Sequence, residues 1–411
     1  MSDESELGEV KELVINKSKL HDWQEKALSF FFNNNCQAIY ECGTGTGKTR
    51  LAIELIAEVW KKDPEINFLI VVPKNVILET GWYKELSAYG ISIVDIGAYY
   101  GLAKEYGKIT LSNMQNLSDV ELDRFQGVIF DEVHTYTTPR LLEIVKTPFK
   151  YKIGLSATVE RKEKKHWQLL GCFGYNIFTY GLKEAIKDDI INSFEFINVG
   201  IIMDEETKKK YDEINAEINV MIASFSLRGI MSRDNDTKYS LLKKINERNM
   251  IVNNYYGKFS AINKICSQHQ GKKILIFNQY NEQTNKCYWH LLEVGIKARI
   301  IHSGLDDKTR QKNLSEYAKG AFNVLLTSRV LDEGYNLPSI DVGIIMAGNS
   351  TERQTVQRMG RILRKKITKS YLYQIYCIDT IEEKYAMKKT KLFKPLCLSY
   401  TEIVYHGEKG D

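Results

Sequence analysis

The stretch ECGTGTGKT, residues 41–49, decides how the first part of this 411-residue chain folds. A short apolar run, 38–40, precedes it, and a run with helical periodicity, 49–61, follows it. A glycine-rich turn between a strand and a helix surrounds a phosphate chain with backbone N–H groups. In that setting Lys48 can reach the outer phosphates and the Thr49 hydroxyl can bind Mg²⁺. The sequence therefore predicts a nucleotide site on an α/β sheet.

A second motif, DEVH at 131–134, follows the apolar run 128–130. A buried parallel strand that ends in two acids presents their carboxylates at the rim of its sheet. We expect Asp131 to hold Mg²⁺, mostly through its water shell, and Glu132 to orient and deprotonate the water that attacks the γ-phosphate. His134 is expected to couple the nucleotide to nucleic acid, although a hydrogen-bonded structural histidine fits the same position.

Two hydroxyl side chains, Ser156 and Thr158, follow a further strand-like run at 151–155. Because parallel strands end at the same edge of a sheet, these hydroxyls are expected beside the phosphate site. There they would relay changes at the nucleotide to a second domain.

The segment QRMGRILR, 357–364, carries basic residues at helical spacing. Gln357, Arg361 and Arg364 are four and three residues apart, so they share one face of a helix. We expect the two guanidinium groups to stabilise charge on the γ-phosphate from across a cleft, which is the role of an arginine finger. The alternative is a basic helix face that contacts solvent or nucleic acid.

The order of these motifs resembles that of superfamily 2 helicases, over about 20–393. Within the superfamily the chain resembles the group that includes XPB-type repair helicases, the phage helicase UvsW and the motor parts of type I and type III restriction enzymes. LHDWQEKAL at 20–28 resembles the first motif of this group, and SRVLDEGYNLP at 328–338 and STERQTVQRMGRILRKK at 350–366 resemble its last two motifs. The chain departs from the usual patterns at Cys42, where a glycine is common, and at Asn336, where the family often has Asp.

The resemblance implies a set of nucleotide contacts, in which Gln24 reads the adenine edge. The implied ATP-binding residues are Gln24, Gly43, Thr44, Gly45, Thr46, Gly47, Lys48, Thr49 and Gly334. The resemblance also implies two cofactors. They are ATP, which is hydrolysed, and Mg²⁺, which binds with it.

The resemblance also implies a nucleic-acid path across both lobes, on the face opposite the ATP edge. Contacts of this kind go mainly to phosphates and sugars, so they position the strand without selecting a sequence. Each residue alone could equally be an ordinary turn after a strand. The expected contacts are Pro73, Lys74, Ser112, Asn113, Gln115, Asn278, Gln279, His302, Ser303, Gly304, Ser328 and Arg329.

Strand-like runs alternate with helical patterns along the chain, which predicts an α/β fold of two tandem, doubly wound parallel-sheet lobes. The resemblance implies that these lobes are RecA-like. We expect a first lobe at 1–198, a helical insertion or linker at 199–270, and a second lobe at 271–411. The expected strands are 68–72, 91–96, 109–111, 128–130 and 153–155 in the first lobe, and 274–277, 298–301, 324–326, 342–346 and 371–378 in the second.

The predicted helical insertion carries several basic residues, so it could clamp duplex or branched DNA. A solvated helical face explains the same pattern equally well. The residues concerned are Lys208, Lys209, Lys210, Lys243, Lys244 and Arg248.

Composition agrees with a motor that acts on phosphates. The net charge is +5, a modest excess that is compatible with nucleic-acid binding but does not establish it. The seven cysteines form no C-x-x-C pair, which favours reduced thiols in a cytoplasmic compartment. Only six prolines, with plentiful Lys, Asn, Ile and Tyr, suggest an AT-rich genome, such as that of a phage, a large virus or a low-GC bacterium, so the cytoplasm of a bacterium or a phage-infected host is expected. No apolar run approaches the length of a membrane span, so no membrane is expected as a partner.

These features predict an ATP-dependent DNA helicase or translocase that unwinds or branch-migrates single-stranded, forked or branched DNA during recombination, repair or replication. By resemblance the direction is 3′ to 5′. ATP is expected to bind between the lobes and to close them. Three alternatives stay open: an RNA helicase, a non-unwinding translocase that moves a partner along duplex DNA, and a nucleotide-dependent switch.

Overall fold

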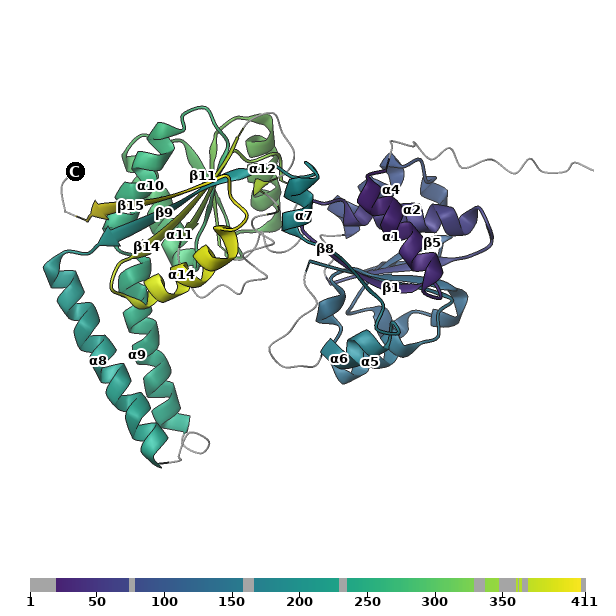
Figure 1. The fold of residues 1–411 in the computed structure, drawn as a ribbon, viewed down its shortest axis with the longest axis horizontal. Helices are drawn as coiled ribbons and strands as arrows, with labels where there is room; N and C mark the ends of the chain where they lie inside the picture. Colours follow the sequence, from purple (N-terminus) through teal and green to yellow (C-terminus); the bar gives the residue numbers. More distant parts are fainter. Residues whose placement is uncertain are drawn as a thin grey trace, which may run out of the picture. The chain divides into compact units, whose positions relative to one another are not determined.

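The computed structural model describes residues 20–73, 78–157, 166–228, 235–328, 337–346, 360, 362–363 and 369–407. These residues divide into two compact units, with the division between Gly181 and Leu182. None of the described helices is long and apolar enough to cross a membrane. Each unit is built on its own sheet and is described separately below (Figure 1).

The described residues of the first unit form an eight-stranded sheet in the order β4-β3-β5-β2-β6-β7-β1-β8. All neighbouring strands are parallel except β3 and β4. The carboxyl ends of the parallel strands therefore lie along one edge of the sheet. The strands are β1 (Gln37–Cys42), β2 (Phe68–Val72), β3 (Ile96–Tyr100), β4 (Ala103–Lys104), β5 (Ile109–Asn113), β6 (Gly127–Phe130), β7 (Tyr151–Ser156) and β8 (Ile177–Tyr180).

Helices cover both faces of the first sheet, as a doubly wound fold requires. Figure 1 shows α5 and α6 on one face and α1, α2 and α4 on the other. The α-helices are α1 (Asp22–Asn33), α2 (Lys48–Trp60), α4 (Tyr83–Ala88), α5 (Pro139–Lys146) and α6 (His166–Gly171). The short helices are the π-helix η1 (Leu78–Trp82) and the 3₁₀ turns η2 (Ile93–Asp95), η3 (Leu117–Asp119), η4 (Leu122–Arg124) and η5 (Val133–Thr135).

The described residues of the second unit form a seven-stranded sheet in the order β11-β12-β10-β13-β14-β9-β15, and every neighbouring pair is parallel. The strands are β9 (Phe194–Ile202), β10 (Ile274–Phe277), β11 (Ala298–Ile301), β12 (Val324–Thr327), β13 (Val342–Met346), β14 (Ser370–Cys377) and β15 (Ser399–His406). The helices are α7 (Leu182–Lys187), α8 (Glu205–Arg228), α9 (Asn235–Asn253), α10 (Tyr256–Gln268), α11 (Asn281–Glu293), α12 (Asp307–Lys319) and α14 (Ile381–Phe393).

The alternation of side chains along β9 explains why the second sheet is covered on both faces. Val199 and Ile201 pack into the same apolar cluster as Ile262 of α10. Phe196 points to the opposite face, where its ring centroid lies 5.5 Å from that of Phe393 in α14. Because successive side chains of a strand point to opposite faces, a strand with apolar residues at both parities must be buried on both sides.

The helical insertion lies within the second unit and not between the two lobes as predicted. The second unit begins at Leu182, and β9 pairs with both β14 and β15, so a strand of the second sheet precedes the insertion. Figure 1 shows α8 and α9 side by side, extending away from this sheet. Helix α10, which we predicted as the end of the insertion, covers the sheet instead. The predicted boundary at 198 falls inside β9.

Most of the predicted strands are confirmed, and their bounds differ by a few residues. The strand expected at 91–96 is wrong: a 3₁₀ turn occupies 93–95 and β3 starts at Ile96. Ile93 and Val94 are 63% and 87% exposed, so these apolar residues are not part of a core. Four further strands, β4, β8, β9 and β15, were not predicted.

A buried ion pair joins α10 to α14 in the second unit. Lys258 and Glu382 are 0% and 2% exposed, and the Lys258 Nζ lies 2.7 Å from a Glu382 carboxylate oxygen. The ammonium also donates to the Val252 carbonyl at 3.0 Å, and the Cys377 N–H donates to the Glu382 carboxylate at 3.0 Å. Burial raises the pKa of Glu382, whereas the nearby Lys258 charge opposes that shift. Each charge is therefore stable in the core only while the other is present.

We predict that Lys258→Met destabilises the second unit by about 3–5 kcal/mol, because it leaves a buried carboxylate without its partner. The double variant Lys258→Met/Glu382→Leu should be less destabilised than the single variant, since it removes both charges from the core. Urea denaturation followed by circular dichroism measures both. A single variant as stable as the unaltered protein would show that this pair does not hold the two helices together.

Candidate active site

The turn after β1 has the backbone conformation of a phosphate-binding loop. Strand β1 ends at Cys42 and α2 begins at Lys48. Gly45 and Gly47 have φ values of +86° and +96°, in the left-handed region that favours glycine. A Cβ atom at Gly47 would also lie 3.1 Å from the Gln24 side-chain nitrogen. These two glycines therefore shape the loop, and its N–H groups and the start of α2 can surround an anion.

Lys48 lies folded back over this loop. Its Nζ donates hydrogen bonds to the carbonyl of Cys42 at 2.9 Å and of Gly43 at 3.4 Å. The Thr46 hydroxyl donates to the same Gly43 carbonyl at 2.7 Å and stabilises the turn. The ammonium group is thus held next to the N–H groups that would face a phosphate chain.

Gln24 connects the first helix to the loop. It is fully buried, its Oε1 accepts from the His21 N–H at 3.0 Å, and its Nε2 donates to the Gly47 carbonyl at 3.3 Å. Beside it, Trp23 stacks on Tyr180 with ring centroids 4.5 Å apart. The sequence analysis missed this aromatic pair, although Trp23 is adjacent to Gln24 in the quoted motif.

The acidic motif follows β6, as predicted. The Asp131 N–H donates to the Val71 carbonyl at 2.8 Å, which fixes the end of β6 against β2. One Asp131 oxygen accepts from the Glu132 N–H at 2.9 Å, and the other accepts from the Trp82 indole N–H at 3.0 Å. Burial raises the pKa of the Asp131 carboxyl, and the Trp82 hydrogen bond and the Lys48 charge act in the opposite direction.

Glu132 has a left-handed backbone, with φ of +48°. Such a conformation is uncommon for a residue with a side chain, and strain of this kind gathers at functional positions. It turns the chain sharply after the strand, between Asp131 and η5.

The predicted coupling residues His134 and Ser156 meet in the structure. Both are buried, and the His134 Nδ1 lies 2.8 Å from the Ser156 hydroxyl and 3.3 Å from a Glu132 carboxylate oxygen. One imidazole therefore contacts both the acidic motif after β6 and the hydroxyl at the end of β7. This is the connection that a relay would need, and it is equally a hydrogen-bonded structural histidine.

The candidate nucleic-acid residues of the first unit lie along the same carboxyl edge as the phosphate loop. This corrects the prediction that they face away from the ATP edge: β2, β5 and β1 are all parallel, so their ends share one edge. Ser112 and Asn113 are buried. The Ser112 hydroxyl donates to the Tyr99 carbonyl at 2.9 Å, and the Asn113 side-chain oxygen accepts from the Asn116 N–H at 2.8 Å. Pro73 is half-buried and Gln115 is exposed.

The candidate residues of the second unit follow β10, β11 and β12, which also end at one edge. Asn281, which the sequence analysis did not single out, joins two of these ends. Its Oδ1 accepts from the Ser328 hydroxyl at 2.6 Å and its Nδ2 donates to the Ser303 hydroxyl at 3.1 Å. The buried Asn278 side chain has no hydrogen-bond partner among the described residues. Gln279 is buried beside it.

His302 is held inside the second unit. Its Nε2 lies 3.0 Å from the Asn285 side-chain oxygen, and its Nδ1 accepts from the Gly304 N–H at 3.1 Å. Burial lowers the pKa of His302, and the nearby Arg310 lowers it further, which favours the neutral form of the ring.

Several predicted site residues lie outside the described part of the chain. They are Lys74, Thr158, Arg329, Gly334, Gln357, Arg361 and Arg364.

Oxygen donors suited to a hard divalent cation are present at the loop and at the end of β6. They are the hydroxyl of Thr49, the second residue of α2, and the Asp131 carboxylate. Mg²⁺ is commonly bound by one or two protein oxygens together with substrate phosphates, so this donor set fits it.

Two family models match the chain, one in each half. The model described as "Type III restriction enzyme, res subunit" matches residues 17–161, and that described as "Helicase conserved C-terminal domain" matches 257–366. The first match contains the phosphate loop and the acidic motif. The second contains the candidate residues that follow β10, β11 and β12.

Curated relatives align over most of the chain at low identity. The DNA 3'-5' translocase XPB2 of Sulfurisphaera tokodaii is 24% identical over 407 residues, which cover 92% of this chain and 86% of that protein. The DNA 3'-5' helicase XPB of Mycobacterium tuberculosis is 21% identical over 402 residues, which cover 93% of this chain and 66% of that protein. The chain spans 52% to 66% of the length of four such relatives, so their further regions have no counterpart in the alignment.

Solved structures share the fold. The helicase domain of Hef from Pyrococcus furiosus matches with a TM-score of 0.64 at 15% identity, covering 90% of this chain and 98% of that one. S. cerevisiae Dbp5 bound to RNA and ADP BeF3 matches with a TM-score of 0.64 at 14% identity, covering 94% and 90%. The two parallel-sheet lobes are thus of the RecA-like type found in helicases, as predicted.

We predict different effects for two substitutions at this site. Lys48→Ala should weaken ATP binding and abolish turnover, because it removes the charge that is expected to bind the outer phosphates. Glu132→Gln should leave ATP binding nearly intact and lower turnover by about a hundredfold or more, since it removes only water activation. Nucleotide titrations and ATPase assays separate the two. An equal loss of binding in both variants would contradict these roles.

Proposed function

The chain belongs to the superfamily 2 helicases, in the group of the XPB-type helicases and the type III restriction motors, and we propose that it is an ATP-driven motor that moves along DNA and separates or remodels its strands. The observation that carries the proposal is the order β6-β7-β1 in the first sheet. It brings the acidic motif, the Ser156 hydroxyl and the phosphate loop to three adjacent strand ends.

In the proposed mechanism, the loop N–H groups and Lys48 bind the phosphates of ATP, and Gln24 contacts the adenine. Thr49 and Asp131 would hold Mg²⁺, which supplies positive charge to the phosphates. Glu132 orients the attacking water and accepts its proton. His134 and Ser156 respond to the state of Glu132 and pass that change to the nucleic-acid contacts. Arg361 and Arg364, outside the described residues, are proposed to stabilise the charge that develops on the γ-phosphate.

DNA is the proposed track, and 3′ to 5′ the proposed direction. The support is the names of the relatives, several of which are DNA 3'-5' translocases or helicases. The contacts would go to phosphates and sugars through the polar residues at the strand ends of both units. Roles in recombination, repair or replication would follow from the DNA structure that the motor prefers.

An RNA helicase is the second candidate, because Dbp5, whose structure contains RNA, has the same fold at low identity. Backbone contacts to one strand serve either polymer, so the fold does not separate the two. A translocase that moves on duplex DNA without unwinding it is the third candidate, since the first family model is named after a restriction enzyme subunit.

The helical hairpin α8–α9 is less suited to clamp DNA through charge than its sequence indicated. Lys208 lies 2.6 Å from the Asp212 carboxylate, and Lys244 lies 2.7 Å from Glu217. Arg248 is 8% exposed and donates to the Asn215 side chain at 2.8 Å. These three cations are therefore neutralised or buried within the protein.

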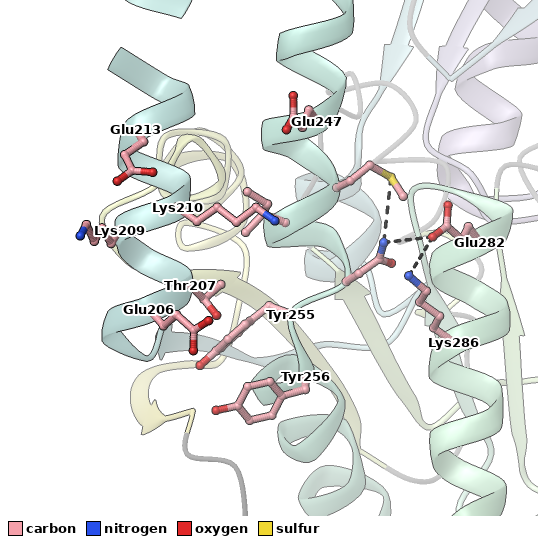
Figure 2. A pocket seen from close by; sticks show the side chains of 13 residues that line it. Glu206, Thr207, Lys209, Lys210, Glu213, Glu247, Tyr255, Tyr256, Glu282 and Lys286 are labelled. Carbon is pink, nitrogen blue, oxygen red and sulfur yellow. Dashed lines mark hydrogen bonds and ion pairs between the residues drawn. The ribbon is translucent and has the colours of Figure 1, made fainter. Parts of the chain in front are cut away.

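The other two lysines of the run, Lys209 and Lys210, line a groove of about 1050 Å³ at the base of the hairpin (Figure 2). One further lysine lines it, together with four acids: Lys286, Glu206, Glu213, Glu247 and Glu282. Tyr255 and Tyr256 form part of its wall. Because the acids outnumber the lysines, the groove offers little attraction to a phosphate backbone.

We predict that DNA stimulates the ATPase more than RNA of the same sequence, and that the protein displaces a strand from forked DNA only with ATP. ATPase and strand-displacement assays on single strands, duplexes, forks and four-way junctions measure this, with Glu132→Gln as the inactive control. Equal stimulation by RNA would favour the RNA helicase. Stimulation by duplex DNA without displacement would favour the translocase.

We also predict that replacing Lys208, Lys209 and Lys210 by Ala leaves the salt dependence of DNA binding nearly unchanged. The slope in question is that of the logarithm of the binding constant against the logarithm of the salt concentration. Each lost phosphate contact would reduce its magnitude by about one unit. Binding titrations over a range of salt concentrations test this, and Lys243→Ala provides a comparison at an exposed lysine of the same hairpin. A slope whose magnitude decreases by several units would contradict this prediction and support the DNA clamp.

A further inference from the structure

A buried tryptophan in a short helix contacts the acidic motif. Trp82 is 1% exposed, and its indole Nε1–H donates to the Asp131 Oδ2 at 3.0 Å. Trp82 is the last residue of η1, the short π-helix that follows β2 along the chain. It lies 49 residues before Asp131, so the contact depends on the fold and not on local sequence.

With this contact, both oxygens of the Asp131 carboxylate accept a hydrogen bond. The other oxygen, Oδ1, accepts from the Glu132 N–H at 2.9 Å. A carboxylate offers about four acceptor positions, so one hydrogen bond on each oxygen leaves lone pairs free on both. The backbone is also fixed, because the Asp131 N–H donates to Val71 at the end of β2. Strand β2 and the helix after it therefore hold both the main chain and the side chain of Asp131.

A carboxylate in this position could rotate about its side-chain torsions if only its backbone were fixed. The terminal torsion of Asp is broad, so a hydrogen bond to each oxygen is what defines the plane of the group. The indole N–H only donates, which suits an acceptor oxygen. Groups that orient a metal-binding carboxylate change metal affinity or activity by about 10- to 100-fold when they are removed.

We propose that Trp82 is a positioning residue for Mg²⁺: its indole N–H holds the Asp131 carboxylate in the orientation that receives the cation bound with the nucleotide. The inference rests on the proposed function, since it assigns Asp131 to that cation. The role proposed for Trp82 acts through Asp131 alone. Its indole ring is also part of the core, so packing and positioning must be separated by experiment.

The test is Trp82→Phe, which keeps a large apolar ring and removes the N–H. The control is Trp60→Phe, because Trp60 is also buried, at 7% exposure, and its Nε1–H donates to the Ile66 carbonyl at 2.7 Å, away from the acidic motif. The affinity for ADP is measured in EDTA and across a Mg²⁺ titration. The ADP affinity in EDTA measures how well the phosphate loop binds the nucleotide. The increase in ADP affinity on adding Mg²⁺ measures how well the cation site binds the metal.

For Trp82→Phe we expect an unchanged ADP affinity in EDTA and a Mg²⁺ requirement raised by about 10- to 100-fold. Trp60→Phe should match the unaltered protein in both conditions. In ATPase assays, excess Mg²⁺ should restore part of the lost kcat of Trp82→Phe. A purely structural role would instead lower the ADP affinity in EDTA as well, and added Mg²⁺ would restore nothing.

Replacement of Trp82 by β-(3-benzothienyl)alanine keeps the ring shape and has sulfur in place of the N–H, so it serves if the phenylalanine variant does not fold. A Mg²⁺ dependence equal to that of the unaltered protein in this variant overturns the inference and leaves the proposed function intact. If the unaltered protein gains no ADP affinity from Mg²⁺, the assignment of Asp131 to the cation fails, and the inference fails with it, whereas failure of ATP-dependent strand displacement would count against the proposed function itself.

Discussion

The parallel pairing of β6, β7 and β1 is the constraint on which the site depends. In register, Ile39 lies beside Gly154 on β7, and Gly154 lies beside Phe130 on β6. This alignment brings the carboxyl ends of the three strands to the same edge of the sheet, so three motifs that are far apart in sequence meet there. A slip in this register would move the acids away from the phosphate loop. The conformation of each loop matters only once this pairing is made.

Much of this arrangement could be predicted from the sequence because its signals are local. The phosphate loop needs glycine at Gly45 and Gly47, and both have the left-handed backbone that explains them. The acidic motif follows four consecutive buried residues, which is how a strand buried on both faces is recognised. His134 and Ser156 were predicted as separate coupling residues, and their hydrogen bond follows from neighbouring strand ends.

The rest depends on partners that no local pattern reveals. Trp82 has the composition of an ordinary core residue, and its N–H contact with Asp131 exists only after β2 and β6 pair. Ser112 looked like a surface contact after a strand, but its hydroxyl is used inside the protein. The lysines of the hairpin indicated a basic surface until their acidic neighbours were located in space. A count of charges along a sequence cannot give the charge of a surface.

The position of β9 has a consequence for how the chain is made. This strand, Phe194–Ile202, is the first of the second sheet to leave the ribosome, yet its two neighbours are β14 and β15, which are the last. The hairpin, four strands and several helices must be synthesised before β9 can form its hydrogen bonds. The first sheet, by contrast, is complete when β8 emerges. During synthesis both edges of this apolar strand therefore remain unpaired until β14 and β15 have been made. We expect the second unit to fold more slowly than the first for this reason. We also expect it to be the unit that is more exposed to aggregation or in need of a chaperone.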